Sequence, residues 1–166
     1  MNTIPTTHVL FVSRENACRS LLAEACLRHV AVGGLHAHSC GVPFMVGDRA
    51  HRWTLLALQT AAISARDLRC KDWTEFTRPD APTMDFVIAL DAATALDNPV
   101  WPGQPEIALW DYPDIATHHK IVTNPGEVTM QTLHSLRRRI ELFAILCAKG
   151  KSHADLRHDL QDLAFV

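Results

Sequence analysis

The stretch His8–Ala25, HVLFVSRENACRSLLAEA, contains the clearest structural signal in this chain. Its apolar residues Val9–Val12 predict a buried strand, and the polar residues Ser13–Cys18 predict a loop. A helical pattern begins directly afterwards. A strand that enters a helix through a short loop gathers backbone N–H groups around one point, at the positive end of the helix dipole. The stretch therefore predicts an oxyanion site in this loop.

Arg19 closes the loop and is the side chain that we expect to bind an oxyanion. Its planar guanidinium presents a fork of N–H donors that matches a tetrahedral oxyanion better than an ammonium does. The alternative is a structural arginine that ties the loop to its own carbonyl groups. Asn16, inside the loop, is expected to hold the backbone shape, because asparagine tolerates left-handed conformations.

Length and composition indicate one globular domain over residues 1–166, with 48% apolar and 20% charged residues. The formal net charge of -2 gives no field that would draw the chain to nucleic acid or to a membrane surface. Neither a transmembrane run nor a signal peptide is expected from the apolar pattern. Five cysteines, an odd number without a secreted-scaffold spacing, favour the cytoplasm.

Apolar periodicity predicts strands that alternate with helices along the rest of the chain. Further strands are expected at His36–Cys40, Phe86–Leu90 and Ile107–Trp110. Helices are expected at residues 17–31, from an Asp48 cap to about Ile63, at Glu127–Cys147 and at residues 152–163. The pattern favours a three-layer α/β fold with a four-stranded parallel sheet and helices on both faces. Such sheets bind ligands at the carboxyl ends of their strands, where the loop falls.

The loop resembles the C-x5-R-S phosphate loop of low-molecular-weight protein tyrosine phosphatases and thioredoxin-coupled arsenate reductases. Asn16, Cys18, Arg19 and Ser20 match it, and residues 23–25 match the start of the family's first helix. The resemblance covers about residues 8–147. It implies a low-molecular-weight phosphatase fold and an oxyanion-binding loop made of Ser13, Arg14, Glu15, Asn16, Ala17, Cys18, Arg19 and Ser20.

Two later segments place the chain closer to the arsenate reductase branch. The string PVWPGQP, Pro99–Pro105, resembles part of the redox segment of the reductases. Residues Trp110–Asp114 resemble the family's aspartate loop, in which the second acid donates a proton. The resemblance therefore implies Ser13, Arg19 and Asp114 as the catalytic positions.

Ser13 stands where the family has its nucleophilic cysteine, and the register of PVWPGQP places the two relay cysteines of the reductases at Leu90 and Asn98. A serine hydroxyl is far less acidic than a thiol and normally needs an adjacent base, but the nearest histidine in sequence, His8, lies at the other end of the strand. We expect Ser13 to hydrogen-bond an oxyanion without attacking it. The alternatives are a weak nucleophile, or a serine introduced in place of a natural cysteine.

Three functions remain open at this point. The first is a catalytically impaired protein that binds phosphate, arsenate or a phosphorylated partner in the loop. The second is an active phosphatase or an enzyme related to arsenate reductases. The third is an interaction module with a vestigial loop, in which Trp53, Trp73 or Trp101 lies at a partner surface; such tryptophans more often pack in the core.

The residues themselves predict no cofactor. The resemblance adds a possible potassium ion near Asn16 and Glu24, with Ser39 and Asp67 as further oxygen ligands. His36, His38 and Cys40 alternate along one strand and are zinc-ligand types, with ordinary packing as the alternative. Cys18 lies near a helix N-terminus beside an arginine, so its thiol is expected either to have a lowered pKa or to be a small buried apolar group.

Overall fold

The computed structural model describes residues 5–31, 33–115 and 123–166. Its sheet contains four parallel strands, in the spatial order β2-β1-β3-β4. These strands are β1 (Thr7–Val12), β2 (Leu35–Cys40), β3 (Phe86–Ala89) and β4 (Glu106–Leu109). All four lie where the sequence predicts them, within one or two residues, and the predicted parallel sheet is confirmed.

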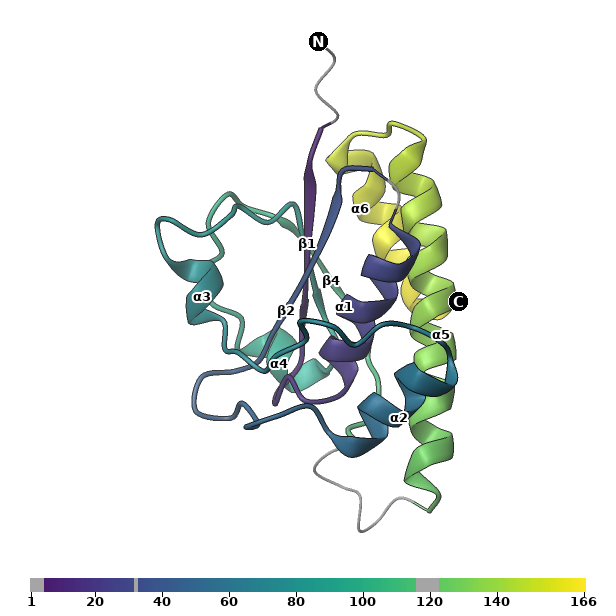
Figure 1. Cartoon of the computed structure of the whole chain (residues 1–166). Coiled ribbons are helices and arrows are strands. Elements are labelled where there is room, and N and C mark those ends of the chain that lie inside the picture. Colours follow the sequence, from purple (N-terminus) through teal and green to yellow (C-terminus); the bar gives the residue numbers. More distant parts are fainter. Residues whose placement is uncertain (1–4, 32, 116–122) are drawn as a thin grey trace.

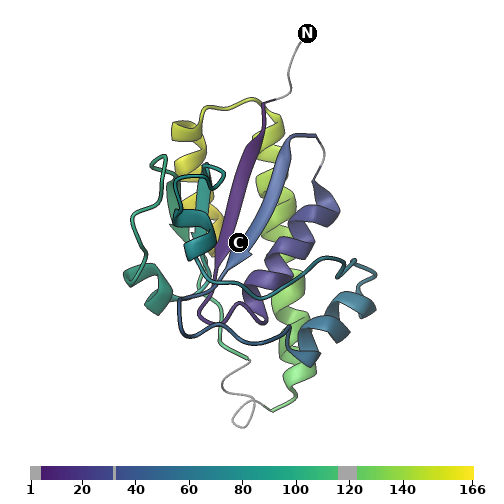
Figure 2. The ribbon, with the colours of Figure 1, turned by 60° about the vertical axis from the view of Figure 1, so that its left-hand side comes forward.

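Helices cover both faces of this sheet (Figures 1 and 2). One face carries α1 (Arg19–Val30), α2 (Arg52–Thr60) and α5 (Pro125–Ala148), with α6 (His153–Asp162) and the 3₁₀ helix η1 (Leu163–Phe165) packed beside β4. The other face carries α3 (Thr74–Thr77) and α4 (Ala92–Leu96). The three-layer α/β architecture is therefore as predicted.

The central strand β1 shows why the sheet is covered on both sides. Its last four residues, Val9–Val12, are all 0% exposed, so neither face of this strand meets water. Val9 and Phe11 join the core formed with α1 and α5, and Leu10 and Val12 join a second cluster on the opposite face. A strand that is buried on both faces appears in sequence as an unbroken apolar run rather than an alternating one.

The chain order places the loop after β1 at a switch point of the sheet. From β1 the chain proceeds to β2 on one side, and it returns to β3 on the other side. The loop Ser13–Cys18 follows the carboxyl end of β1 and leads directly into α1. This is the crevice in which open parallel sheets bind ligands.

The start of α2 differs from the sequence prediction. The helix begins at Arg52 and is capped by His51, whose Nδ1 accepts from the Trp53 N–H at 3.3 Å, whereas we expected a cap at Asp48. The reason is tertiary, because Gly47 and His51 donate their backbone N–H groups to loop carbonyls. The chain between them is held against the loop and turns into a helix only afterwards.

Two other features of the described residues bear on function. No described helix has the length and apolarity needed to cross a membrane. Within the described ranges, no group of three histidine, cysteine or acidic side chains is arranged to hold a metal ion, so His36, His38 and Cys40 form no zinc site there.

Three histidines pack together at the amino end of the sheet. His8 Nδ1 lies 2.9 Å from His38 Nε2, and the His8 ring stacks on His36 with 5.0 Å between ring centroids. Burial, together with the neighbouring histidines, lowers the pKa of His38 to about 4. The cluster is therefore stable when His38 is neutral.

The lowered pKa of His38 predicts a loss of stability in mild acid. In the unfolded chain His38 takes up a proton near pH 6.5, and in the folded chain only near pH 4. Its contribution to the free energy of unfolding is therefore complete above about pH 6.5 and falls as the pH drops toward 4. Urea unfolding at several pH values should give a steeper acid loss for wild type than for His38→Gln. Parallel profiles for the two proteins would contradict this.

Candidate functional site

Several carbonyl groups of the Ser13–Ser20 loop point outward, toward the segment that follows β2. Three of them accept hydrogen bonds from the segment that follows β2: Arg14 O from Val42 N–H at 3.0 Å, Glu15 O from Gly47 N–H at 3.0 Å and Ala17 O from His51 N–H at 2.8 Å. In a trans peptide the N–H points away from the carbonyl group of the same unit. The N–H groups of Glu15, Asn16 and Cys18 are therefore directed toward the inside of the loop, as an anion site requires.

Asn16 holds the middle of the loop. Its φ of 50° lies in the left-handed region, as predicted. Its side-chain amide donates to the hydroxyls of Ser20 at 2.7 Å and Ser39 at 3.0 Å, and its oxygen accepts from the Lys71 backbone N–H at 2.9 Å. A left-handed non-glycine residue costs about 1–2 kcal/mol, whereas each such hydrogen bond contributes about 0.5–1.5 kcal/mol. The three bonds therefore offset the strain.

Ser13 is the first residue of the loop and is 2% exposed. Its hydroxyl lies 2.6 Å from the hydroxyl of Ser20, and its backbone N–H donates to Cys40 O at 3.2 Å. His8 lies at the opposite end of β1, where it bonds to His38. The N-cap of α1 is Cys18 rather than Ser20, so the Ser20 hydroxyl contacts Ser13 instead of capping the helix.

Arg19 is buried at 5% exposure and is held by three groups. Its Nη1 donates to Tyr112 O at 2.9 Å, and its Nη2 lies 3.4 Å from Asp91 and 3.7 Å from Asp114. The guanidinium thus spans from the loop to the aspartate segment, and it brings the expected residues Arg19 and Asp114 together. The carbonyl that it contacts belongs to Tyr112 rather than to the loop.

Asp91 is a site residue that the sequence reasoning missed. One carboxylate oxygen accepts from the Arg14 backbone N–H at 3.2 Å and the other accepts from Thr94 N–H at 2.7 Å, where it caps α4. The same side chain is paired with Arg19. The available signal was an aspartate that follows a buried strand and has a threonine three residues later, which is an N-cap pattern at a carboxyl strand end.

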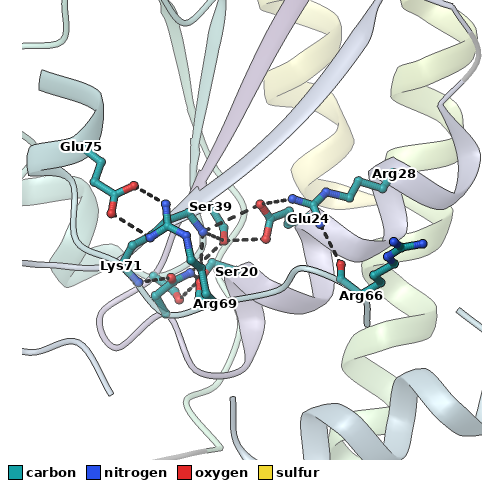
Figure 3. Close-up of polar contacts among 10 residues, drawn as sticks. Ser20, Glu24, Arg28, Ser39, Arg66, Arg69, Lys71 and Glu75 are labelled. Atoms are coloured by element: carbon teal, nitrogen blue, oxygen red, sulfur yellow. Dashed lines mark hydrogen bonds and ion pairs between the residues drawn. The ribbon is translucent and has the colours of Figure 1, made fainter. Parts of the chain in front are cut away.

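A buried polar network lies behind the loop (Figure 3). Glu24 on α1 is 1% exposed and accepts from Ser39 Oγ at 3.1 Å, while the Lys71 ammonium lies 3.8 Å from its carboxylate. Burial raises the pKa of Glu24 and lowers the pKa of Lys71, and each partner opposes the shift of the other. Potassium at Asn16 and Glu24 stays a prediction. Asp67, the further ligand considered for it, is 84% exposed and lies near Arg66.

Cys18 has a raised rather than a lowered pKa. The residue is 4% exposed, and burial raises its pKa to about 11, although Thr54 and Arg19 act in the opposite direction. Desolvation therefore outweighs the Thr54 hydrogen bond and the arginine charge. Cys18 is the small buried group of the two possibilities considered.

The remaining candidate positions lie in packed surroundings. Leu90, at the expected place of a relay cysteine, is 0% exposed in the core. Trp101 is 4% exposed and packs edge-on against Trp73, with 6.3 Å between ring centroids. The Trp53 ring lies next to Gly126 of α5. These tryptophans all contribute to internal packing.

The chain belongs to the low molecular weight phosphotyrosine protein phosphatase family, whose model matches residues 8–152. The crystal structure of YfkJ from Bacillus subtilis is 23% identical over 88% of this chain and 98% of YfkJ, with a TM-score of 0.68. An arsenate reductase in its phosphate binding state is 21% identical over 84% of this chain and 98% of the reductase, with a TM-score of 0.62.

A third structure is a cysteine-to-serine mutant of the arginine phosphatase YwlE, a protein known from Bacillus subtilis, with a phosphorylated active site serine. It is 19% identical over 86% of this chain and 97% of YwlE, with a TM-score of 0.64. At these identities the likeness establishes the shared fold. No curated protein matches the chain.

Gly41 packs so closely against the loop that there is no room for a side chain at this residue. A Cβ at this residue would lie 2.9 Å from Val46 Cγ2, 3.0 Å from Arg14 O and 3.1 Å from Asn16 Cβ. Gly41→Ala should therefore lower the free energy of unfolding by about 1–3 kcal/mol. Gly47→Ala is the matched control, since its nearest contact would be an ordinary 3.4 Å. Equal stabilities of the two variants in urea would contradict the prediction.

Proposed function

We propose that this protein binds a phosphate-like oxyanion, phosphate or arsenate, in the Ser13–Ser20 loop, either as the free ion or on a phosphorylated partner. Arg19 binds two oxygens of the anion with its planar guanidinium, and the inward N–H groups of the loop bind the others. Ser13 contributes a hydroxyl hydrogen bond instead of an attacking group. The protein is thus a catalytically impaired member of its family.

The observation that carries this proposal is the outward direction of the loop carbonyls. Three external N–H groups hold Arg14 O, Glu15 O and Ala17 O away from the loop interior. The adjacent N–H groups are thereby set for an anion before it arrives, at the N-terminus of the twelve-residue helix α1. Prearranged donors of this kind bind an anion without the cost of ordering a flexible loop.

The same donors do not make Ser13 a good nucleophile. Loop N–H groups and a helix dipole can stabilise a thiolate at neutral pH, but an alcohol needs a base to take its proton. The Ser13 hydroxyl bonds to another hydroxyl, that of Ser20, which is no stronger as a base. Asp114, which the family resemblance assigns as proton donor, then has no leaving group to protonate.

The comparisons support the ligand class. The family model is that of a phosphotyrosine phosphatase, and the similar arsenate reductase was solved in a phosphate binding state. Both proteins handle a tetrahedral oxyanion or its ester.

The five cysteines are free thiols, which supports the expectation of a reducing compartment such as the cytoplasm.

One observation favours a second function, that of an active or partly active phosphatase. The serine mutant of YwlE carries a phosphoryl group on its active site serine. A serine at this place in the fold can therefore be a phosphoryl acceptor. If Ser13 acts in the same way, the chain would be phosphorylated once and would release the group slowly, because an alkoxide is a poorer leaving group than a thiolate.

Removal of the Arg19 guanidinium should weaken oxyanion binding. A hydrogen bond to a charged group contributes about 1.5–3 kcal/mol, so we expect Arg19→Ala to bind phosphate about 10- to 100-fold more weakly than wild type. Titration calorimetry with phosphate, arsenate and sulfate measures this. Arg137→Ala, which removes a surface arginine of α5, is the control and should leave the affinity unchanged. Identical heats for wild type and Arg19→Ala would overturn the proposal.

A single substitution separates the two functions. Ser13→Cys should hydrolyse an aryl phosphate, whereas wild type and Ser13→Ala should not, because only the thiol can be ionised by the loop. Mass spectrometry of wild type after incubation with the aryl phosphate tests for a phosphoryl group on Ser13. Turnover or a stable adduct in wild type would favour the second function over the first.

A further inference from the structure

A buried lysine lies among three oxygen atoms behind the oxyanion loop (Figure 3). The side chain of Lys71 is 8% exposed. Its ammonium donates to Arg69 O at 3.1 Å and Ser39 Oγ at 3.4 Å, and it lies 3.8 Å from Glu24 Oε1. A main-chain carbonyl, a hydroxyl and a carboxylate are the oxygen types that bind hard cations in place of water.

The potassium ion that the family resemblance suggests does not fit these residues as they are arranged. The oxygen of the Asn16 amide already accepts from the Lys71 N–H, and Ser39 Oγ bonds to both Asn16 and Glu24. The Lys71 ammonium lies beside two of the oxygens that the ion would need, those of Ser39 and Glu24. The cluster therefore has a cation of its own.

We propose that the Lys71 ammonium is an internal monovalent cation that holds the oxyanion loop in its binding shape. Lys71 is thus a positioning residue and does not contact the anion. The proposed effect on anion affinity rests on the proposed function. The proposed effect on stability and on the response to potassium does not.

The contacts lead from Lys71 to the loop in three steps. The ammonium balances the charge of Glu24, Glu24 accepts from Ser39, and Ser39 accepts from the Asn16 amide. Asn16 then fixes Ser20, whose hydroxyl contacts that of Ser13.

The backbone of Lys71 strengthens this link. Its N–H donates to Asn16 Oδ1 at 2.9 Å, and its carbonyl accepts from the N–H of Gly41 at 2.8 Å. Both the ammonium and the backbone of Lys71 therefore hold the loop in place. A shift of either part of Lys71 would break contacts that position Asn16.

A second cation, Arg28, also contacts Glu24, at 3.0 Å, but from a more exposed position. Its side chain is 41% exposed, compared with 8% for Lys71. Water and salt screen an exposed charge more strongly than a buried one. Lys71 is thus the main internal partner of the Glu24 carboxylate. In agreement with this, Lys71 lowers the pKa of Glu24 more than Arg28 does.

The test is whether potassium stabilises the protein after the Lys71 ammonium has been removed. Wild type should have the same melting temperature in potassium chloride and in tetramethylammonium chloride at equal ionic strength. Lys71→Met should melt lower, and potassium should raise its melting temperature by about 3 °C or more relative to tetramethylammonium, because a bound ion stabilises the folded state. Lys71→Gln serves as a second variant that retains polarity.

Two controls separate this role from a general loss of packing or charge. Arg69→Met removes a neighbouring cation that is 61% exposed and leaves the Arg69 carbonyl in place, so it should produce no potassium response. The double variant Lys71→Met with Glu24→Gln removes both charges and should also show none. A potassium-specific response in wild type, or equal behaviour of both salts in Lys71→Met and Lys71→Gln, would overturn the proposal.

Calorimetry with inorganic phosphate supplies the functional readout. Lys71→Met should bind phosphate at least about 10-fold more weakly in tetramethylammonium chloride and should recover affinity in potassium chloride, while wild type should bind equally in both. If wild type releases no heat with phosphate, the proposed function fails and the melting experiment still decides the role of Lys71. Unchanged affinity of Lys71→Met would contradict the positioning role.

Discussion

The hydrogen bonds that hold the loop carbonyls outward are the constraint on which the site depends. Peptide geometry couples each carbonyl to the N–H of the next residue, so a bond on the outside orients a donor on the inside. The segment between β2 and α2 supplies these bonds, and Asn16 supplies the left-handed turn between them. This outer layer therefore keeps the N–H groups of Glu15, Asn16 and Cys18 directed into the loop.

Holding an anion and attacking it require different chemistry, and under the proposed function this chain does only the first. Arg19 is buried and held by Asp91, Asp114 and a carbonyl, so its donors are ordered before a ligand arrives. The attacking position holds a hydroxyl, and the acidity of an alcohol lies beyond what N–H groups and a helix dipole can change. The relay positions are occupied by an apolar side chain and an amide. Together these features support the proposal of oxyanion binding without turnover.

Buried charges form the second organising element of the structure. Glu24 and Lys71 are both almost inaccessible to water, and burial acts against the charged form of each. Removal of one partner from such a pair is usually far more costly than removal of both. The pair therefore connects α1 to the segment before α3, and it fixes the amide of Asn16 from behind.

The sequence determined the sheet, the loop and the conformation of Asn16. Unbroken apolar runs specify strands that are buried on both faces. A strand–loop–helix pattern places N–H donors at a helix N-terminus. The strands and the donor loop therefore both follow from residues that are adjacent in the sequence. The presence of Arg19 and Ser13 in the loop was likewise visible in the sequence. These features depend on local chemistry, which a single sequence displays.

Only the tertiary structure decided which distant groups complete the site. Asp91 and Lys71 reach the loop across 77 and 55 positions of sequence, by contacts with Arg14 and Asn16. The sequence around Asp91 indicates a helix cap at a strand end, but nothing in it names Arg14 or Arg19 as partners, and Lys71 has no local signal at all. The cap of α2 is His51 rather than the expected Asp48, because hydrogen bonds to the loop hold the chain that precedes His51 out of the helix. Cys18 has a raised pKa because burial outweighs its hydrogen bond with Thr54 and the charge of Arg19. Long-range contacts and desolvation exist only after the chain has folded, which is why the sequence alone could not indicate them.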